Sequence, residues 1–513
     1  MATITTAADL GIPPTFNAAT YFVDRHLREG RGGKVAIECA DERVTYAELA
    51  ERVNRTASVL RDAFDVRPEE RVVLLLLDMP AFHAAFFGAI KIGAVPIPVN
   101  TLWKTPGYRY VLNDSRARVA IVSDALLPKI AALDRADVPA LRHVVAAGTD
   151  LDALAARASP ALDAEPVSRD APAFWLYSSG STGAPKGCVH LQHDMVVCAE
   201  LFAKGILNLT ERDRCFSVAK LFFAYGLGNA GYFPLAVGAT SILMPDPPAA
   251  ASVYAAIARH RPTIFSSVPT GFAMLLAQPG EFDLSSIRLA VSAGESLPAP
   301  LYERFKQRFG IDILDGIGST EALHMFTSNR PGAIRPGSSG LIVPGYAAAI
   351  LDERKQPVPQ GDMGDLWVSG DSICAEYWNQ HEKTKATIHG DWIRTGDRYS
   401  QDADGFYWHG GRSDDMLKVG GQWVSPIEVE AALAAHGAVH ECAVVGREDA
   451  DGLTKPIAFV VLRDARAATP ALAADLQQFV RATLAEYKRP RWVEFLPELP
   501  RTATGKVQRF KLR

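Results

Sequence analysis

The sequence of 513 residues contains no long hydrophobic run. Its longest uninterrupted stretches of hydrophobic side chains have six residues, whereas a helix that crosses a bilayer needs about 20. We therefore expect no insertion into a membrane. The N-terminal segment Met1–Gly11 has neither a positively charged start nor an apolar core, so it gives no sign of a secretory signal.

Cysteine is scarce and scattered. The chain has six cysteines, and no two of them form a Cys-x-x-Cys pair. This spacing argues against a structural zinc site and against a disulfide framework, and free thiols are typical of a reducing compartment. We therefore expect a cytoplasmic protein.

An excess of positive charge is also missing. Lys and Arg number 54 against 58 Asp and Glu, which gives a net charge of −4, and no long basic block interrupts the sequence. Proteins that bind nucleic acids usually carry a basic patch that neutralises phosphates. Nucleic acid is therefore not expected as a partner.

The chain does contain enough apolar residues to build several cores. Hydrophobic residues make up 48%, and a single core stops growing at roughly 250–300 residues, so two or more domains are expected. Residues 72–77, 81–91 and 94–99 predict a strand, a crossover helix and a second strand. Similar alternation continues, with strands predicted at 119–122, 144–147, 241–244, 263–266 and 288–291 and helices at 250–259 and 298–309. This pattern predicts helix-flanked parallel sheets, the α/β class.

The pattern of predicted strands and helices changes twice towards the C-terminus. From about Val343, short strands with Gly and Asp turns predict a small β-barrel-like part. After Gly410–Asp415, helices predicted at 429–435 and 470–486 and strands at 440–446 and 457–462 indicate an α+β module. We therefore predict an N-terminal domain of residues 1–413 and a small C-terminal domain of residues 414–513, with a hinge at Asp414.

The sharpest local signal is the segment Tyr177–Gly187, with sequence YSSGSTGAPKG. Its glycines let backbone N–H groups approach phosphate oxygens, while its hydroxyl groups and Lys186 add donors and charge. The segment does not fit the P-loop pattern, because Gly187 follows Lys186 where a Ser or Thr is required. We predict a polyphosphate loop, with a flexible surface turn as the alternative. Its binding residues would be Ser178, Ser179, Gly180, Ser181, Thr182 and Gly183.

This loop resembles the signature loop of the adenylate-forming superfamily, which includes acyl-CoA synthetases, adenylation domains and luciferases. Four further segments match motifs of that superfamily in the same order. They are Gly316–Glu321 (GIGSTE), Trp392–Asp397 (WIRTGD), Gly411–Gly421 (GRSDDMLKVGG) and Pro500–Lys506 (PRTATGK). The resemblance extends from about residue 40 to the C-terminus and implies a mobile C-terminal domain.

The resemblance implies roles for individual residues. Lys506, Glu321, Thr320 and Lys186 would be catalytic, and Glu321 would hold Mg²⁺. Asp397 and Arg412 would bind the ribose of ATP. The adenine would be bordered by Gly294, Glu295, Ser296, Asp315, Gly316 and Ile317. Many relatives have a tyrosine where Ile317 stands, so this sequence would offer the base an aliphatic contact in place of a ring stack.

The chemistry of acid activation is consistent with these residue types. A carboxylate resists attack by a thiol because it is anionic and its leaving group would be oxide. Attack of the carboxylate on the α-phosphate of ATP gives an acyl-adenylate, whose leaving group is AMP. Lysines and Mg²⁺ would offset the negative charge of the acid and the triphosphate together.

The resemblance also implies that the segment Lys220–Gly228 (KLFFAYGLG) borders the acyl pocket. Its aromatic side chains suit a short flat acid, although a buried aromatic core is the alternative. Around this segment the resemblance is closest to benzoate–CoA ligases, which implies benzoate as substrate. Hydroxy-, amino- and halobenzoates and small alicyclic acids stay open. The pocket would be lined by Phe223, Ala224, Tyr225, Gly316, Gly318 and His324, and a packed core histidine is the alternative for the last.

The resemblance also implies coenzyme A as the acceptor. After the hinge at Asp414, the residues Lys418, Gly420 and Gly421 would line the pantetheine channel. No carrier segment is present up to Arg513, so free coenzyme A is expected. The alternatives are an adenylating enzyme that loads a separate carrier protein and a non-enzymatic nucleotide-binding protein. A homodimer is the default oligomeric state.

Overall fold

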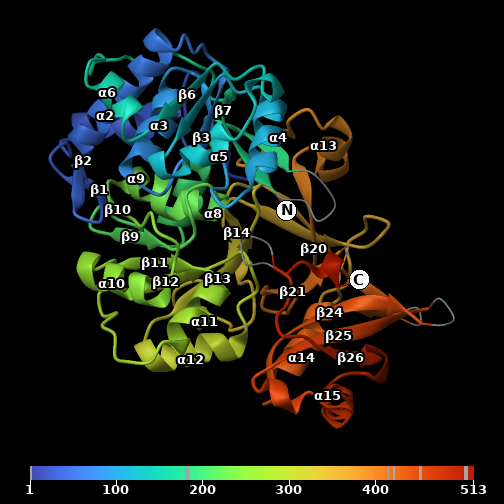
Figure 1. Cartoon of the computed structure of the whole chain (residues 1–513). Coiled ribbons are helices and arrows are strands. Elements are labelled where there is room, and N and C mark those ends of the chain that lie inside the picture. Colours follow the sequence, from blue (N-terminus) through green and yellow to red (C-terminus); the bar gives the residue numbers. More distant parts are fainter. Residues whose placement is uncertain are drawn as a thin grey trace. The chain divides into compact units, whose positions relative to one another are not determined.

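The computed structural model describes residues 3–178, 185–413, 415–419, 422–449, 453–501 and 507–512 (Figure 1). Two compact units make up the chain. The first comprises Met1–Ala348 and Val368–Ile393, and the second comprises Ala349–Trp367 and Arg394–Arg513. The predicted hinge residue Asp414 lies outside the described residues, so the predicted boundary stays a prediction.

The first unit contains a four-stranded parallel sheet with the order β4-β3-β5-β6. The strands are β3 (Arg71–Leu75), β4 (Val95–Pro98), β5 (Val119–Val122) and β6 (His143–Ala146). Helix α3 (Pro80–Lys91) connects β3 to β4, which confirms the predicted βαβ unit. Apolar residues of these strands form one buried cluster with Tyr108, Val111 and Leu112 of helix α4 (Thr105–Ser115).

A nine-stranded sheet with the order β15-β14-β13-β12-β11-β9-β10-β1-β2 forms the second layer of this unit. Its central pairs are parallel, whereas the pairs β1–β2, β13–β14 and β14–β15 are antiparallel. The strands are β1 (Val35–Cys39), β2 (Glu42–Thr45), β9 (Arg214–Ser217), β10 (Thr240–Leu243), β11 (Ile264–Ser267), β12 (Leu289–Ser292), β13 (Ile313–Gly318), β14 (Met325–Ser328) and β15 (Leu341–Ile342).

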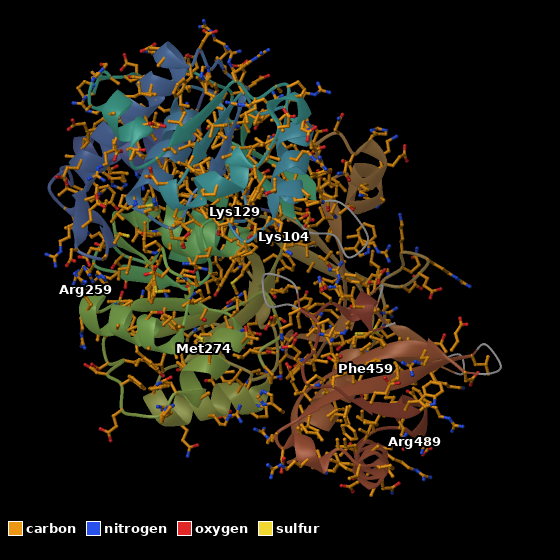
Figure 2. The ribbon with its side chains drawn as sticks, in the orientation of Figure 1. Lys104, Lys129, Arg259, Met274, Phe459 and Arg489 are labelled. Atoms are coloured by element: carbon orange, nitrogen blue, oxygen red, sulfur yellow. The ribbon has the colours of Figure 1, made fainter. Side chains whose placement is uncertain are left out.

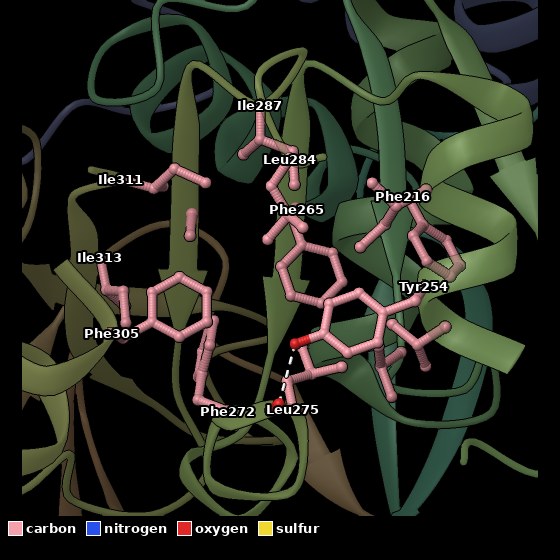
Figure 3. Close-up of a cluster of buried hydrophobic side chains, with 14 of the residues drawn as sticks. Phe216, Tyr254, Phe265, Phe272, Leu275, Leu284, Ile287, Phe305, Ile311 and Ile313 are labelled. Carbon is pink, nitrogen blue, oxygen red and sulfur yellow. Dashed lines mark hydrogen bonds between the residues drawn. The ribbon is translucent and has the colours of Figure 1, made fainter. Parts of the chain in front are cut away.

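Three helices cover the β9–β13 region of this sheet, namely α10 (Ala250–His260), α11 (Pro269–Ala277) and α12 (Ala299–Phe309). Figure 3 shows the buried cluster that they form with the strands. Phe265 of β11 meets Phe272 of α11 edge to face at 5.8 Å between ring centroids. The Tyr254 hydroxyl donates to the Leu275 carbonyl at 2.8 Å, so its buried polar atom is satisfied. Met274, labelled in Figure 2, packs against this core.

A three-stranded antiparallel sheet, order β18-β8-β7, carries the predicted polyphosphate loop between two of its strands. Its strands are β7 (Pro172–Ser178), β8 (Lys186–Leu191) and β18 (Glu376–Tyr377). Ser178 pairs with Lys186 in the β7–β8 ladder. The ends of the loop are therefore fixed next to each other.

Other helices of the first unit are α1 (Arg25–Arg28), α2 (Tyr46–Ser58), α5 (Leu127–Ala131), α6 (Asp150–Ala155), α7 (Asp194–Cys198), α8 (Ala224–Gly226), α9 (Phe233–Val237) and α13 (His381–Thr387). Helix α2 begins with a capping box, in which Thr45 and Glu48 satisfy each other's backbone N–H groups. Across the described residues, every helix is too short or too polar to span a bilayer. All six cysteines are free, as expected.

A five-stranded sheet of shorter elements has the order β16-β17-β20-β19, and β21 pairs with β20. Its strands are β16 (Ala347–Leu351), β17 (Gly364–Ser369), β19 (Ile388–His389), β20 (Trp392–Gln401) and β21 (Tyr407–Arg412). Turns such as Asp402–Gly405 connect them, as the Gly and Asp content predicts.

The C-terminal part is an α+β module. It contains the hairpin β22 (Leu417–Val419) and β23 (Gln422–Val424), the sheet β24 (Val439–Glu448), β25 (Thr454–Leu462) and β26 (Trp492–Phe495), and helices α14 (Pro426–Ala434) and α15 (Pro470–Thr483). Alternate residues of β25 serve two cores. Ala458 and Val460 pack with α14 and α15, whereas Phe459, labelled in Figure 2, packs on the other face. The predicted fold class, α/β followed by α+β, is confirmed.

Candidate active site

Lys186 is the lysine of the predicted phosphate loop, and it is the first residue of β8. Its Nζ is 4.0 Å from Glu321 Oε1 and 4.3 Å from the centre of the Tyr377 ring. The structure thus brings together two predicted catalytic residues that are far apart in the sequence. Ser179, Gly180, Ser181, Thr182 and Gly183 lie outside the described residues, so their roles stay predictions.

Tyr377 completes this cluster, and the sequence analysis missed it. Its hydroxyl donates a hydrogen bond to Glu321 Oε1 at 2.7 Å. Burial, and next the Glu321 carboxylate, raise the pKa of Tyr377 far above its ordinary value, so the hydroxyl remains a donor. Tyr377 is placed by the pairing of β18 with Cys188 of β8. No motif around Tyr377 signals this contact, because it depends on strand pairing across almost 190 residues.

The donor set around Glu321 fits Mg²⁺. The Glu321 carboxylate and the neighbouring Thr320 hydroxyl are hard oxygen donors, which Mg²⁺ prefers. In the part of the chain that the structure describes, no group of three or more His, Cys, Asp or Glu side chains could hold a metal ion. Mg²⁺ is typically held by one or two carboxylates together with substrate phosphates and water. A single carboxylate beside a phosphate loop matches that mode.

The predicted adenine-binding residues lie at the carboxyl ends of two adjacent parallel strands. Ser292 at the end of β12 pairs with Asp315 of β13, and ligands commonly bind at this edge of α/β sheets. Gly294 follows β12 with φ of +87°, a conformation that favours glycine. Glu295 and Ser296 come next and are partly buried. Ile317, further along β13, pairs with Thr327.

Asp315 is a buried acid with an incomplete set of partners. One carboxyl oxygen, Oδ2, accepts from the Leu297 N–H at 3.4 Å. The other, Oδ1, has no hydrogen-bond partner among the described residues. Burial raises the pKa of Asp315 to about 8, so the carboxyl is mostly protonated at neutral pH. A protonated carboxyl can donate a hydrogen bond from this position.

His324 lies in an aromatic box. Its ring stacks on Tyr225 at 5.7 Å between centroids, and Phe233 and Phe202 lie at 4.5 and 5.0 Å. Neither ring nitrogen has a hydrogen-bond partner among the described residues. Burial lowers the pKa of His324 to about 3, so the imidazole is neutral. The structure thus brings together Tyr225 and His324, two of the predicted pocket residues.

Tyr225 is fixed by its own hydroxyl group. It donates to the carbonyls of Ser267 at 3.1 Å and Val291 at 2.9 Å, at the ends of β11 and β12. Phe223 and Ala224 directly precede it at the start of α8, and their position in the pocket stays a prediction. The amine of the nearby Lys220 donates hydrogen bonds to the main-chain carbonyls of Met244 and Asp246, at 2.5 and 2.8 Å. It is therefore held by the protein rather than free for an acid substrate.

The two predicted glycines of β13 are required by close packing. A Cβ at position 316 would lie 2.9 Å from Ser328 Cα, and one at position 318 would lie 2.8 Å from the Met325 nitrogen. Neither backbone atom can move aside without disturbing β14. Gly316 and Gly318 therefore allow β13 to approach β14 closely, next to His324.

In the second unit, Asp397 and Arg412, the two residues predicted to bind the ribose, pair with each other. They lie opposite each other in the β20–β21 ladder, and Arg412 Nη1 donates to Asp397 Oδ1 at 3.2 Å. The Asp397 carboxylate is mostly buried, whereas Arg412 is about half exposed. A carboxylate held in this way can accept hydrogen bonds from two ribose hydroxyls. Their contact with ribose stays a prediction.

The remaining predicted residues belong to the C-terminal part. Lys418 lies on β22, opposite Trp423 of β23 in the hairpin ladder. Lys506, Asp414, Gly420 and Gly421 lie outside the described residues. Their roles in catalysis, hinge motion and coenzyme A binding stay predictions.

Comparison with known proteins agrees with this geometry. Residues 23–378 match the family model described as AMP-binding enzyme, and residues 428–506 match that of the AMP-binding enzyme C-terminal domain. The chain is 51% identical to a benzoate–CoA ligase of Thauera aromatica over 98% of this chain and 96% of the relative. It is 44% identical to a 4-hydroxybenzoate–CoA/benzoate–CoA ligase of Rhodopseudomonas palustris, over 97% and 94%.

A solved structure of a benzoate CoA ligase from Burkholderia xenovorans LB400 superposes with a TM-score of 0.89 at 46% identity, covering 97% of this chain and 100% of the other. The anthranilate CoA ligase AuaEII, solved in complex with anthranoyl-AMP, gives a TM-score of 0.93 at 44% identity over 98% of both chains. The chain therefore belongs to the AMP-binding enzyme family, the adenylate-forming superfamily.

Proposed function

We propose that this protein is an ATP-dependent ligase that converts benzoate, or a close aryl carboxylic acid, into its coenzyme A thioester. The benzoate carboxylate attacks the α-phosphorus of ATP, and pyrophosphate leaves. The coenzyme A sulfur then attacks the carbonyl carbon of the benzoyl-adenylate, the thiol proton is lost, and AMP leaves. The products are benzoyl-CoA, AMP and pyrophosphate.

One observation carries this proposal. The turn after β13 holds Glu321 at its start and His324 three residues later. Glu321 belongs to the cluster with Lys186 and Tyr377, which suits phosphates and Mg²⁺, whereas His324 belongs to the aromatic box with Tyr225. A flat acid bound beside His324 would have its carboxylate close to the phosphate site, because Glu321 and His324 are three residues apart on the same turn.

The roles of the charged groups follow from this arrangement. Lys186 would offset charge on the phosphates, and Glu321 with the Thr320 hydroxyl would hold Mg²⁺ at the same place. Bound Mg²⁺ would supply charge neutralisation of the triphosphate. Lys506 is proposed to act at the α-phosphate in adenylation. Asp397 and Arg412 are proposed to hold the ribose.

The aromatic side chains of the predicted pocket favour an aryl acid over a long alkyl acid as substrate. Tyr225, Phe233 and Phe202 surround His324, and this side chain is neutral because burial lowers its pKa to about 3. A neutral imidazole with two unpartnered nitrogens can also donate to, or accept from, a ring substituent. Hydroxy- and aminobenzoates therefore stay within the proposed substrate range. The cytoplasm is the proposed location because all six thiols are free.

The test is a panel of acids assayed for coenzyme A-dependent AMP formation. Benzoate, 4-hydroxybenzoate, 2-aminobenzoate and 4-chlorobenzoate are compared with a medium-chain fatty acid. We expect the highest kcat/KM for benzoate and little turnover of the fatty acid. In a second arm, a phosphopantetheinyl carrier protein replaces free coenzyme A. Acid-dependent pyrophosphate release with thioester formation only on the carrier would contradict the ligase proposal, and absence of both would contradict any adenylating activity.

A further inference from the structure

The main chain of the turn that carries Glu321 is held by two buried segments, strand β8 and residues 372–374. Three successive carbonyl oxygens, of residues 320–322, each accept a hydrogen bond from a different donor. The pairs are His190 Nε2 with the Thr320 carbonyl at 2.8 Å, the Cys374 N–H with the Glu321 carbonyl at 2.7 Å, and the Ser372 hydroxyl with the Ala322 carbonyl at 2.9 Å. The backbone of this turn is therefore fixed independently of its side chains.

His190 differs from the other two donors because it is an ionisable side chain with no exposed surface. Its second ring nitrogen, Nδ1, is 2.8 Å from Oδ2 of Asp194, which is equally buried. The Leu191 N–H donates to the same carboxyl oxygen at 3.1 Å. His193 Nε2 lies 3.3 Å from the other oxygen of Asp194, but that oxygen has no hydrogen-bond partner among the described residues. The hydrogen bonds that hold Asp194 therefore go to Oδ2, the oxygen that faces His190.

Hydrogen-bond chemistry sets the direction of one of these contacts. The Thr320 carbonyl can only accept, so His190 Nε2 donates to it. The contact of Nδ1 with Asp194, on the other side of the ring, fixes the imidazole so that Nε2 stays aimed at this carbonyl.

Strand β8 holds the turn at two points. Lys186 at the start of β8 faces the Glu321 carboxylate, and His190, four residues along the same strand, binds the adjacent Thr320 carbonyl. Leu323 in the turn has a positive φ of 65°, which is unfavourable for a residue with a Cβ and persists only where the surroundings fix it. The clamp from β8 supplies such a constraint.

We propose that His190, paired with Asp194, is a positioning residue that orients the Thr320–Glu321 segment for the phosphates and Mg²⁺ of bound ATP. This inference rests on the proposed function, and it adds a residue that acts on the nucleotide site through the main chain. His190 itself touches neither the nucleotide nor the metal. The same side chain would otherwise serve only to fill the core beside Phe174, whose ring stacks on it at 5.2 Å.

The test compares three variants of the whole 513-residue chain. His190→Phe keeps an aromatic ring next to Phe174 but removes both ring nitrogens, whereas His190→Gln keeps an amide that can donate to the Thr320 carbonyl. His193→Phe is the matched control. His193 is also a buried histidine beside Asp194, but its nitrogens face the carbonyls of Arg169 and Asp371, at 2.9 and 3.0 Å, and not the turn.

Two readouts separate positioning from folding. The first is the rise in Tm on adding Mg·ATP without acid, which reports binding and requires no turnover. The second is the Mg²⁺ concentration that half-saturates benzoate-dependent ATP–pyrophosphate exchange. For His190→Phe we expect most of the Tm rise to be lost and the half-saturating Mg²⁺ concentration to increase about tenfold, because the Thr320–Glu321 segment loses its hydrogen bond from β8. His190→Gln should be intermediate, and His193→Phe should resemble the parent.

Equal losses in His190→Phe and His193→Phe would overturn the proposal, because a general packing defect would then explain both. A folded His190→Phe whose Tm rise and Mg²⁺ dependence are within about twofold of the parent would also overturn it. If His190→Phe does not fold, His190→Gln decides by the same criteria. Failure of the proposed function is distinguishable, since the parent would then show no benzoate-dependent exchange while the Mg·ATP shift still tests His190.

Discussion

Substituting alanine for Gly228 should displace His324 and so weaken both packing and acid binding. A Cβ at position 228 would collide with His324 Cδ2 and would lie 2.7 Å from Nε2. Ordinary contacts begin near 3.4 Å. The imidazole cannot move freely, because Tyr225, Phe233 and Phe202 surround it at 5.7, 4.5 and 5.0 Å between centroids. The ring must therefore shift by nearly 1 Å, or the backbone of residue 228 must.

The size of the effect follows from two opposing contributions. Overpacking of a filled core costs about 1–3 kcal/mol. Gly228 lies in the helical segment Leu227–Tyr232, where alanine is favoured over glycine by about 1 kcal/mol. We expect a net loss of about 0–2 kcal/mol in the free energy of unfolding. The KM for benzoate should rise, whereas the KM for Mg·ATP should change little.

A double-mutant cycle isolates the steric contribution. In the His324→Ala background the colliding ring is absent, so Gly228→Ala should no longer be penalised and its helical preference should dominate. The new contact with Phe233 Cε2, at 3.1 Å, exists in both backgrounds and cancels. Urea unfolding of the four proteins should give a coupling energy of at least about 1 kcal/mol. Additive effects, with coupling below about 0.3 kcal/mol, would refute the idea that Gly228 exists to accommodate His324.

Four further substitutions test other parts of the site. Burial raises the pKa of Asp315 from 3.8 to about 8. Between these two pH values the folded protein keeps a proton that the unfolded chain has released, so the free energy of unfolding falls as the pH rises. Asp315→Asn should therefore stabilise the protein more at about pH 8.5 than at about pH 4.5 in urea unfolding, and a pH-independent difference would contradict this. Tyr377→Phe removes the hydroxyl that donates to Glu321 at 2.7 Å, so benzoate-dependent pyrophosphate exchange should fall about tenfold with little change in Tm, and an unchanged rate would speak against the contact. Ala224→Leu should raise the KM for benzoate steeply and leave that for ATP nearly constant in steady-state assays, unless Ala224 lies outside the pocket. Lys506→Ala should abolish most pyrophosphate exchange yet still form thioester from supplied benzoyl-adenylate, and equal loss of both half-reactions would reject its assignment to adenylation.

Elements with strong local patterns were predictable from the sequence. The strand predicted at 119–122 is β5 with the same bounds, and the helix predicted at 81–91 is α3, Pro80–Lys91. Buried parallel strands read as continuous apolar runs, which makes them easy to recognise. The helix predicted at 470–486 ends earlier, at Thr483, because Leu484 already has an extended backbone. Boundaries of this kind depend on one or two φ and ψ angles that the residue pattern does not determine.

The site was predictable only where one segment carries its own signal. Glu321, Lys186 and Asp397 were predicted as site residues because each lies in a short motif. Tyr377 and His190 were not, since their roles arise from pairing between distant strands. Tyr377 reaches Glu321 through the β18–β8 ladder, and His190 reaches Thr320 across 130 residues. Neither residue type at those positions indicates the contact, because a lone Tyr or His in an apolar strand is most often part of the core.

The segment that runs from β13 into the turn before β14 departs from the ordinary rules of folding at several positions. Asp315 is buried with one unpartnered oxygen, Leu323 adopts a positive φ, and both nitrogens of His324 lack partners among the described residues. Each departure costs stability, and such costs persist in proteins mainly where a ligand later supplies the missing contacts. The three hydrogen bonds to the carbonyls of residues 320–322 hold this unfavourable turn in place before any ligand binds. Because the turn is already ordered, binding of nucleotide and acid would not have to offset the entropy of ordering it.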